Sequence, residues 1–362
     1  MNQSRRRTLA APHLYVMPHR ICFFARVQTP DILERVEFYS QDIKALRDLG
    51  YDVSIATRVH HLRPADLYYV WWWTWAFAPL AMGKMLGKPV IVAGVLDRAY
   101  YDRNLPPHRW VQRRVLANAD ANVFVSRHEI EEHSRTFRIN NPRYAPLTVD
   151  TAAYHPAAAD RDPGLVFTVG WTEEQNALRK CFPEIVEAAI RVCRARAGVR
   201  FVLAGEHGGY YPRLQAMIDE AGMQERIRFP GVFTREEKIA HMQRCTVYLQ
   251  PSRYEGFGMA IAEAMSCGAP VITSPAGEVV HVAGPDALMV DGTQPDQIAA
   301  AVQRLLDDPA LRDDYGRRAR ARMESLFSYE RRRDEIGAVV REVLARHAGG
   351  AAPAPAAPPP DR

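Results

Sequence analysis

The chain has 362 residues, of which 47% are hydrophobic and 25% are charged, and its formal net charge is +5. This length suits two domains of ordinary size better than one, and the composition is typical of a soluble globular protein. The small positive charge favours anionic ligands or an anionic membrane surface. It is too weak to indicate a nucleic-acid-binding protein.

The cysteines and the hydropathy of the chain indicate the cellular compartment in which the protein is expected. The five cysteines lack C-x-x-C spacing and mostly lie in apolar stretches, which predicts buried free thiols, a reducing cytoplasm and no structural zinc site. The arginines at positions 5–7 are not followed by the apolar segment of an export signal. The most apolar stretch, 67–82, is too short to span a bilayer and contains Pro79. We therefore expect a cytoplasmic protein, with peripheral contact to the inner face of the cell membrane left open.

The first half of the chain alternates short apolar runs with stretches of helical length. This pattern is typical of a parallel sheet that helices cover on both faces. Helices are expected at 34–49, ending before Gly50, and from about 74 to Leu86. The expected strands are 21–25, 51–57, 67–73, 89–94 and 121–126.

The pattern pauses between Pro146 and Pro163 and then restarts. Two successive series of strands and helices predict an α/β protein with two Rossmann-like, doubly wound domains and a cleft between them. The second series has expected strands at 165–170, 200–205, 227–231, 246–252 and 269–274, and helices at 177–196, before Gly268, and from 294 to about 346. The predicted segments are an extension (1–18), an N-terminal domain (19–150), a linker (151–163), a C-terminal domain (164–328), a final helix (329–347) and a disordered Pro/Ala tail (348–362).

Residues 251–274 carry the most informative pattern. A strand leads into a turn that contains Gly256 and Gly258, and a helix follows. Such a turn lets a phosphate approach the backbone, and the helix N-terminus supplies free N–H groups and a partial positive charge. We therefore expect Gly256, Phe257, Gly258 and Met259 to form a pyrophosphate cradle.

Two glutamates flank this cradle, Glu255 before it and Glu263 eight residues later. Carboxylates beside an anion site are poor neutralisers of its charge, but they are good acceptors for sugar hydroxyls on either side of a pyrophosphate. A pair with this spacing alone is more often a loop residue and a satisfied helix residue. The strand before it, the two glycines and the strand after it favour the functional interpretation.

The run from Glu255 to Glu263, followed by residues 268–272, resembles the E-x7-E signature of glycosyltransferase family four. These are retaining enzymes of the GT-B architecture. The resemblance covers the C-terminal half well, including 203–209, 229–233 and 276–280. It extends more weakly to 123–129 and 149–156.

The resemblance implies roles for the donor site. It implies that Glu263 binds the ribose hydroxyls, that Glu255 contacts the donor hexose near the reacting carbon, and that the amides of 256–259 hold the pyrophosphate. Gly170 and Val232 are implied as further donor-binding residues. It also implies that the final helix crosses back onto the N-terminal domain and relays closure of the cleft.

A phosphate-binding arginine of the family is missing here, because its place holds Val169, Gly170 and Trp171. The family's Lys-Gly pair is replaced by Lys180 and Cys181. Lys180, with Arg179 compensating for the missing arginine, is our candidate for the charge that stabilises the departing diphosphate. The alternative is that both are surface charges at a helix start.

The N-terminal half departs further from the family. The glycine-rich loop after the first strand and the histidine after the fourth are both absent, and Arg26 and Asp97 at strand ends are weaker candidates for the acceptor site. Four tryptophans between positions 71 and 75 follow the third strand. Aromatic faces stack on sugars. We expect two of these indoles to be buried and at least one, with Trp72 and Trp73 as candidates, to line the acceptor site.

The predicted reaction is transfer of a hexose from a UDP- or GDP-sugar to an acceptor hydroxyl with retention of configuration. The resemblance implies front-face attack, in which the leaving phosphate takes the acceptor proton. We expect no metal and no other cofactor, because no D-x-D motif lies near the pyrophosphate site. The expected partners are the nucleotide sugar and a carbohydrate, lipid-linked or small-molecule acceptor, without nucleic acid.

Three alternatives stay open. A sugar-nucleotide epimerase of the same architecture would need no acceptor, and the E-x7-E pattern argues against it. A non-catalytic binding protein would have lost Glu255 or Lys180, and both are present. Bacterial glycan or glycoconjugate assembly and natural-product glycosylation are both compatible with the sequence.

Overall fold

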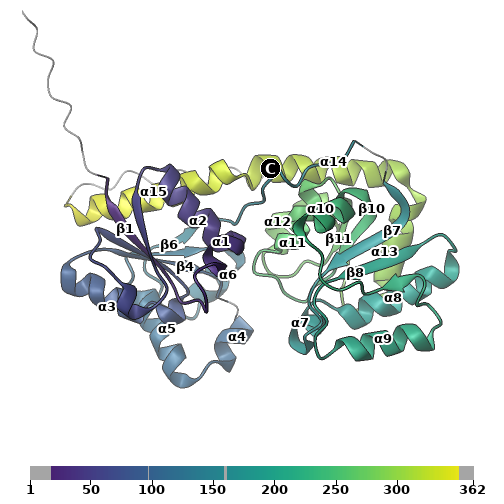
Figure 1. Ribbon diagram of the computed structural model, residues 1–362, viewed down its shortest axis with the longest axis horizontal. Helices are drawn as coiled ribbons and strands as arrows, with labels where there is room; N and C mark the ends of the chain where they lie inside the picture. The colour runs from purple at the N-terminus through teal and green to yellow at the C-terminus, as the bar shows by residue number, and fades with distance from the viewer. Residues whose placement is uncertain (1–17, 97, 159–160, 350–362) are drawn as a thin grey trace, which may run out of the picture.

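The computed structural model describes residues 18–96, 98–158 and 161–349. Asp97, nearly all of the predicted N-terminal extension and most of the predicted C-terminal tail lie outside the described residues. Two sheets lie side by side, each covered by helices, and a line of two long helices runs along both of them (Figure 1).

The first sheet has six parallel strands in the order β2-β1-β3-β4-β5-β6. Its central strands are completely buried, because helices cover both faces. The strands are β1 (Arg20–Ala25), β2 (Asp52–Ala56), β3 (Leu67–Trp71), β4 (Val90–Gly94), β5 (Ala121–Phe124) and β6 (Pro142–Tyr144). The helices are α1 (Ile32–Arg35), α2 (Glu37–Asp48), α3 (Phe77–Leu86), α4 (Arg98–Arg103), α5 (Pro106–Asn118) and α6 (Arg127–Ser134).

The second sheet is also six-stranded and parallel, in the order β12-β11-β10-β7-β8-β9. The predicted fold of two doubly wound α/β units is therefore confirmed. The strands are β7 (Asp162–Val169), β8 (Arg200–Ala204), β9 (Ile227–Arg228), β10 (Cys245–Gln250), β11 (Val271–Thr273) and β12 (Leu288–Met289). The helices are α7 (Glu174–Arg179), α8 (Phe182–Ala195), α9 (Tyr211–Glu220), α10 (Arg235–Arg244), α11 (Met259–Ser266), α12 (Val279–Ala283), α13 (Pro295–Asp307), α14 (Pro309–Leu326) and α15 (Tyr329–His347).

Several predicted helices are interrupted. The helix expected at 34–49 breaks at Val36, a β-branched residue with extended backbone angles (φ −93°, ψ 112°). The helix expected at 177–196 starts earlier and breaks at Cys181, where the backbone is left-handed. The helical stretch from 294 divides before Pro309 and again before Ser328, whose side chain caps α15. The strand expected at 227–231 keeps only two residues, since Pro230 cannot donate to the sheet.

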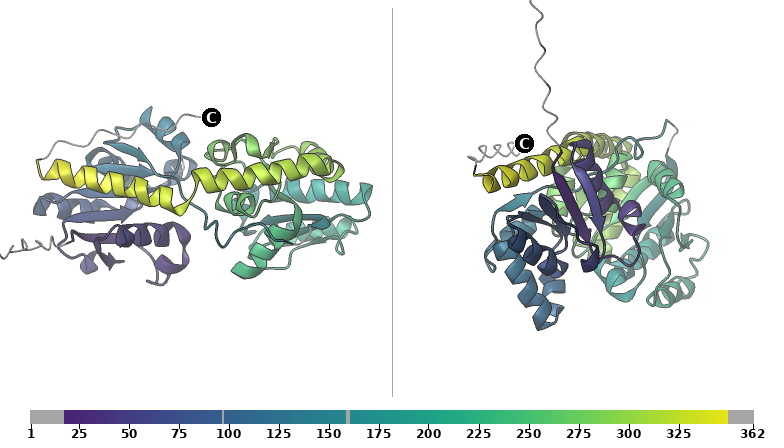
Figure 2. Two further views of the ribbon diagram at one scale, coloured as in Figure 1. Left: turned by 90° about the horizontal axis from the view of Figure 1, so that it is seen from above. Right: turned by 60° about the vertical axis from the view of Figure 1, so that its left-hand side comes forward.

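The last helix, α15, leaves the second sheet and packs on the first (Figure 2). Its Arg332 is fully buried and pairs with the equally buried Asp42 of α2, Nε to Oδ1 at 2.7 Å. The guanidinium also donates to the carbonyls of Ala145 and Pro146, at 2.6 and 2.7 Å. Breaking one partner of a buried ion pair costs about 3–5 kcal/mol, so this contact fixes the helix to the first unit.

All five cysteines are buried and unpaired, as predicted. Within the described residues, no helix combines the length and the apolar content that crossing a bilayer requires.

Candidate donor and acceptor sites

The Glu255 carboxylate is the centre of a buried polar network at the end of β10. Its Oε2 lies 2.9 Å from Nη1 of Arg179, and its Oε1 lies 3.1 Å from Nζ of Lys180. Gln250 and Ser252 each donate to Oε1 at 2.9 Å. Burial alone would raise the pKa of Glu255, but the charges of Lys180 and Arg179 lower it to about 2. The carboxylate is therefore ionised at every working pH and cannot act as a proton donor.

Gly170 makes room for Lys180. A Cβ at position 170 would lie 2.7 Å from Cδ of Lys180 and 2.9 Å from the Phe182 ring. Burial lowers the pKa of Lys180 from its ordinary value, although Glu255 opposes the shift. The aliphatic part of the Lys180 side chain thus lies between the end of β7 and the start of α8, and its amine contacts Glu255.

Helix α11 begins at Gly258, whose left-handed backbone (φ 89°) favours glycine. No side-chain cap hydrogen bond occupies this helix start. Gly256 faces the other domain, since a Cβ there would lie 2.7 Å from Cγ1 of Val95. Phe257 points inward and packs edge-on against Phe327, with ring centroids 5.6 Å apart. The start of α11 can therefore offer its backbone N–H groups to an anion without competition from a capping side chain.

Glu263 is buried on α11 and binds Lys238 of α10 through both oxygens, at 2.7 and 2.9 Å. The ammonium of Lys238 also lies 5.3 Å from the ring centre of Tyr154. Sequence reasoning missed Lys238. A capping box of Thr234 and Glu237 marks the start of its helix, but nothing in that signal shows which face meets Glu263. Val232 is exposed in the loop that leads into α10.

The tryptophans follow β3 and divide into two groups. Trp71 and Trp73 are buried, and their indoles donate to Asp42 and Asn122 at 2.8 Å. Trp72 is half-buried, has a positive φ of 78° and donates to the Tyr39 hydroxyl at 2.6 Å. Trp75 is exposed at 37%. The expectation of two buried indoles is confirmed.

A cavity of about 540 Å³ opens beside this cluster. The Arg26 guanidinium stacks over the Trp75 ring, 4.2 Å from its centre. The structure thus gathers Arg26, Trp72 and Trp73 at one cavity, although Trp73 itself is buried. The other lining residues are Thr74, Trp75, Val95, Leu96, Asn104, His108 and Gln112.

A second cavity, of about 760 Å³, lies between the two units. Arg179, Asn176 and Tyr254 line it from the second unit, and Arg103 and His128 line it from the first. The guanidinium that holds Glu255 therefore also faces a cavity that both domains enclose.

Helix α6 of the first unit is held from the second. Glu278 accepts from the Ser126 hydroxyl at 2.7 Å and from the His128 N–H at 3.2 Å. The Tyr254 hydroxyl donates to Oε1 of Glu129 at 2.8 Å. The other oxygen of Glu129 accepts from the N–H of Leu96, at 2.9 Å. The residue before Glu255 is thereby connected to a wall of the tryptophan-lined cavity.

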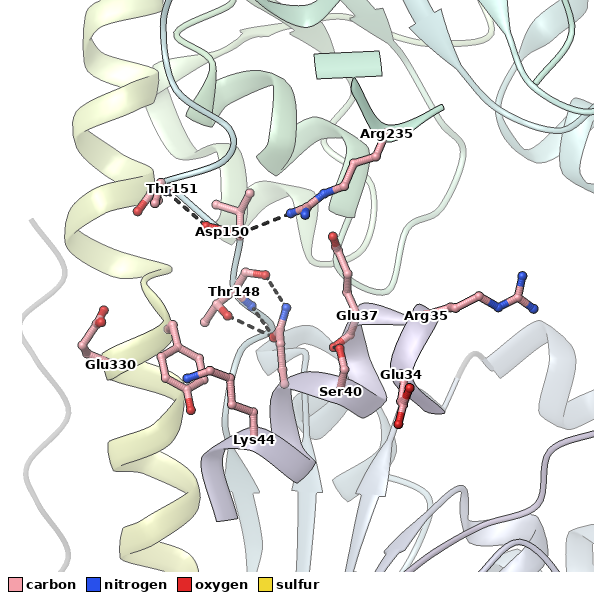
Figure 3. A pocket seen from close by; sticks show the side chains of 14 residues that line it. Glu34, Arg35, Glu37, Ser40, Lys44, Thr148, Asp150, Thr151, Arg235 and Glu330 are labelled. Carbon is pink, nitrogen blue, oxygen red and sulfur yellow. Dashed lines mark hydrogen bonds and ion pairs between the residues drawn. The ribbon is translucent and has the colours of Figure 1, made fainter. Parts of the chain in front are cut away.

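The connection between the domains lines a cavity of about 630 Å³, shown in Figure 3. The side-chain amide of Gln41, in α2, donates to the carbonyl of Thr148 at 2.7 Å and accepts from the N–H of Thr148 at 3.1 Å. Two residues later, Asp150 pairs with Arg235 of α10 at 3.2 Å. Each domain thus holds one end of the three-residue segment from Thr148 to Asp150. Among the described residues, no three His, Cys, Asp or Glu side chains gather as a possible metal site.

Residues 168–322 match the family Glycosyl transferases group 1. This region, which makes up most of the second unit, belongs to the group 1 glycosyltransferases. The chain is 26% identical over 297 residues to an alpha-D-kanosaminyltransferase of Streptomyces kanamyceticus, covering 74% of each chain. It is 24% identical over 280 residues to a GDP-mannose-dependent monoacylated alpha-(1-6)-phosphatidylinositol monomannoside mannosyltransferase of Corynebacterium glutamicum, covering 71% of this chain and 72% of the relative.

Solved structures share the fold of this glycosyltransferase. Sucrose-phosphate synthase of Thermosynechococcus elongatus superposes with a TM-score of 0.74 at 18% identity, over 91% of this chain and 100% of the other. Anabaena Alr3699/HepE in complex with UDP gives 0.75 at 15% identity, over 89% and 99%. The predicted GT-B architecture is confirmed.

In the structure of this glycosyltransferase, some predicted site residues lie together and others lie apart. Glu255, Lys180 and Arg179 form one ionic cluster, and Gly170 lies against it. Glu263 has Lys238 rather than these cations as its partner. Asp97 lies outside the described residues.

Proposed function

We propose that this glycosyltransferase transfers a hexose from a UDP- or GDP-sugar to an acceptor hydroxyl with retention of anomeric configuration. The observation that carries the proposal is the ion cluster of Glu255, Lys180 and Arg179 beside the glycine turn of α11. Cations, free helix N–H groups and an ionised carboxylate meet where a diphosphate and its sugar can lie together.

In this proposal the diphosphate binds the amides of 256–259, with Lys180 and Arg179 neutralising the charge that develops as it leaves. The bond from the anomeric carbon to the phosphate oxygen breaks, and the acceptor oxygen bonds that carbon from the same face. The acceptor proton passes to the departing phosphate. Glu255 accepts hydrogen bonds from the hexose and stabilises its positive charge, since a carboxyl with a pKa near 2 stays ionised.

Glu263 is proposed to receive the ribose hydroxyls, with Gly170 and Val232 bordering the donor. Lys238 already occupies both Glu263 oxygens, so we propose that it orients the carboxylate. The two cations make a metal unnecessary for charge neutralisation, and we propose that the donor binds without one.

The acceptor is proposed to enter the tryptophan-lined cavity, with Arg26, Trp72 and Trp75 around it. The relative named as a phosphatidylinositol monomannoside mannosyltransferase supports a glycolipid acceptor. For this chain we propose glycolipid assembly at the cytoplasmic face of a membrane, because α3 and α5 expose aromatic and basic side chains near this cavity.

Calorimetric titration of UDP and GDP in the presence of a chelator tests the donor site. We expect one of the two to bind the wild type. Glu263→Ala should weaken this binding by roughly 1–3 kcal/mol, the value of a charged hydrogen bond. Glu236→Ala, which removes an exposed glutamate of α10, is the matched control and should bind normally. Binding that requires added magnesium or manganese would exclude the metal-independent proposal.

A further inference from the structure

Large apolar side chains are exposed on two neighbouring helices of the N-terminal domain, α3 and α5 (Figure 1). Phe77 at the start of α3 is 47% exposed, and Trp110 of α5 is 51% exposed. Their ring centres lie 5.8 Å apart, so the two helices present one aromatic surface. Two more large apolar side chains of the same part of the chain are exposed, Met85 of α3 at 80% and Leu105, which precedes α5, at 65%. Monomeric soluble proteins rarely expose contiguous apolar patches of large size unless something binds there.

The same surface is positively charged. Neither α3 nor α5 contains an aspartate or glutamate. Lys84, Arg113 and Arg114 are exposed on them, and the Arg113 guanidinium also donates to the hydroxyl of the buried Tyr101 at 2.7 Å. The Arg114 guanidinium lies 5.5 Å from the centre of the Trp110 ring, so a cation and an indole share one site. We call Phe77, Met85, Leu105 and Trp110, with these three basic residues, the aromatic–basic face.

The aromatic–basic face adjoins the candidate acceptor cavity. Trp75 lies two residues before Phe77, and His108 lies two residues before Trp110; both line the cavity. Their rings are 6.0 Å apart. A molecule held by the face can therefore extend into the cavity over a short path.

We propose that the aromatic–basic face docks on an anionic lipid surface and that the acceptor reaches the cavity from that surface. Aromatic rings and long basic side chains are the groups that sit at the boundary between headgroups and acyl chains. Net positive charge matches anionic headgroups, whereas it disfavours a second copy of the same face. Entry of the acceptor from the lipid surface rests on the proposed transferase function, but docking on that surface does not.

Flotation of the full chain with vesicles tests docking on the lipid surface and requires neither a sugar donor nor turnover. The wild type should float with vesicles that contain phosphatidylglycerol and much less with vesicles of phosphatidylcholine alone. Lys84→Glu/Arg114→Glu should lower the partition coefficient by more than about tenfold, since each basic residue near an anionic surface contributes about fivefold. Phe77→Ser/Trp110→Ser should lower it on both kinds of vesicle.

Trp171→Ser is the matched control, because it removes an equally exposed indole, at 63%, from the C-terminal domain. It should float like the wild type. Circular dichroism and melting curves confirm that every variant is folded, which a substitution of exposed side chains permits. Equal flotation of all variants, or dimerisation of the wild type that Phe77→Ser/Trp110→Ser abolishes, would overturn the proposal. Donor binding in the same preparations reports separately on the transferase function.

Discussion

The carboxylate of Glu278, in the C-terminal domain, accepts a hydrogen bond of 2.7 Å from the Ser126 hydroxyl of the N-terminal domain, and both side chains are fully buried. Ser126 is the N-cap of α6, where a negative charge is stabilised by the helix dipole. The contact therefore joins the two domains on the helix that also carries Glu129 and, through it, Tyr254.

Removing this carboxylate should loosen the contact between the two domains. In Glu278→Ala, the Ser126 hydroxyl and the His128 N–H lose their acceptor, a cost of roughly 1–3 kcal/mol. We expect a larger radius of gyration in solution scattering and a lower kcat, with nucleotide affinity little changed. Glu236→Ala serves as the control. Scattering and kcat equal to those of the wild type would show that the contact plays no part in closure.

The ion cluster predicts a specific pH dependence. Because the folded pKa of Glu255 lies at about 2, below its ordinary value of 4.5, its ionised form stabilises the fold above about pH 4.5. This contribution is lost as the pH falls through the folded pKa, so Glu255 should produce no limb in activity near neutral pH. Burial lowers the pKa of Lys180, so an alkaline limb should appear below the ordinary 10.5.

Lys180→Arg tests the origin of that limb. Arginine stays protonated throughout, so the variant should keep part of the activity and lose the alkaline limb. An unchanged alkaline limb in Lys180→Arg would mean that another group titrates.

The variant Glu255→Gln should lower kcat far more than it weakens nucleoside diphosphate binding, because Glu255 is assigned to the sugar. Steady-state kinetics and calorimetric titration of the same preparation measure the two effects.

The tryptophans should separate by function. Trp75→Ala removes an exposed ring and should raise the acceptor KM several-fold, since ring stacking is worth about 0.5–1.5 kcal/mol beyond area. Trp73→Ala removes a buried ring and should cost about 3–5 kcal/mol of unfolding free energy. Steady-state kinetics and denaturant unfolding measure the two effects. If Trp75→Ala leaves the acceptor KM unchanged, the acceptor does not bind in this cavity.

Cys181 occupies a left-handed backbone position, with φ of 58° and ψ of 37°. Glycine adopts this conformation without the steric cost that a Cβ brings, about 1–2 kcal/mol. Cys181→Gly should therefore be more stable than Cys181→Ala by about 1 kcal/mol, since both lose the buried thiol and only one relieves the strain. Equal unfolding free energies for the two variants would contradict the left-handed conformation.

The sequence predicted the two parallel sheets well, because buried parallel strands are continuous apolar runs and the intervening helices are amphipathic. The sequence did not predict the helix break at Cys181, because nothing in local helix propensity indicated that this residue would adopt a left-handed backbone conformation. Glycine spacing located the start of α11 correctly. Lys238 was missed because its importance comes from a contact across 25 residues with Glu263, which no periodicity records.

We propose that an acceptor-dependent retaining transfer occurs at the Glu255 cluster. Proton NMR of the product anomeric signal, recorded during turnover of the nucleotide sugar with and without an acceptor in chelator, tests it most directly. We predict nucleoside diphosphate release only with acceptor, a product linkage of the same anomeric configuration as the donor, and a near-complete loss of both in Glu255→Gln. An inverted linkage, or conversion of the sugar nucleotide without any acceptor, would contradict a retaining transferase.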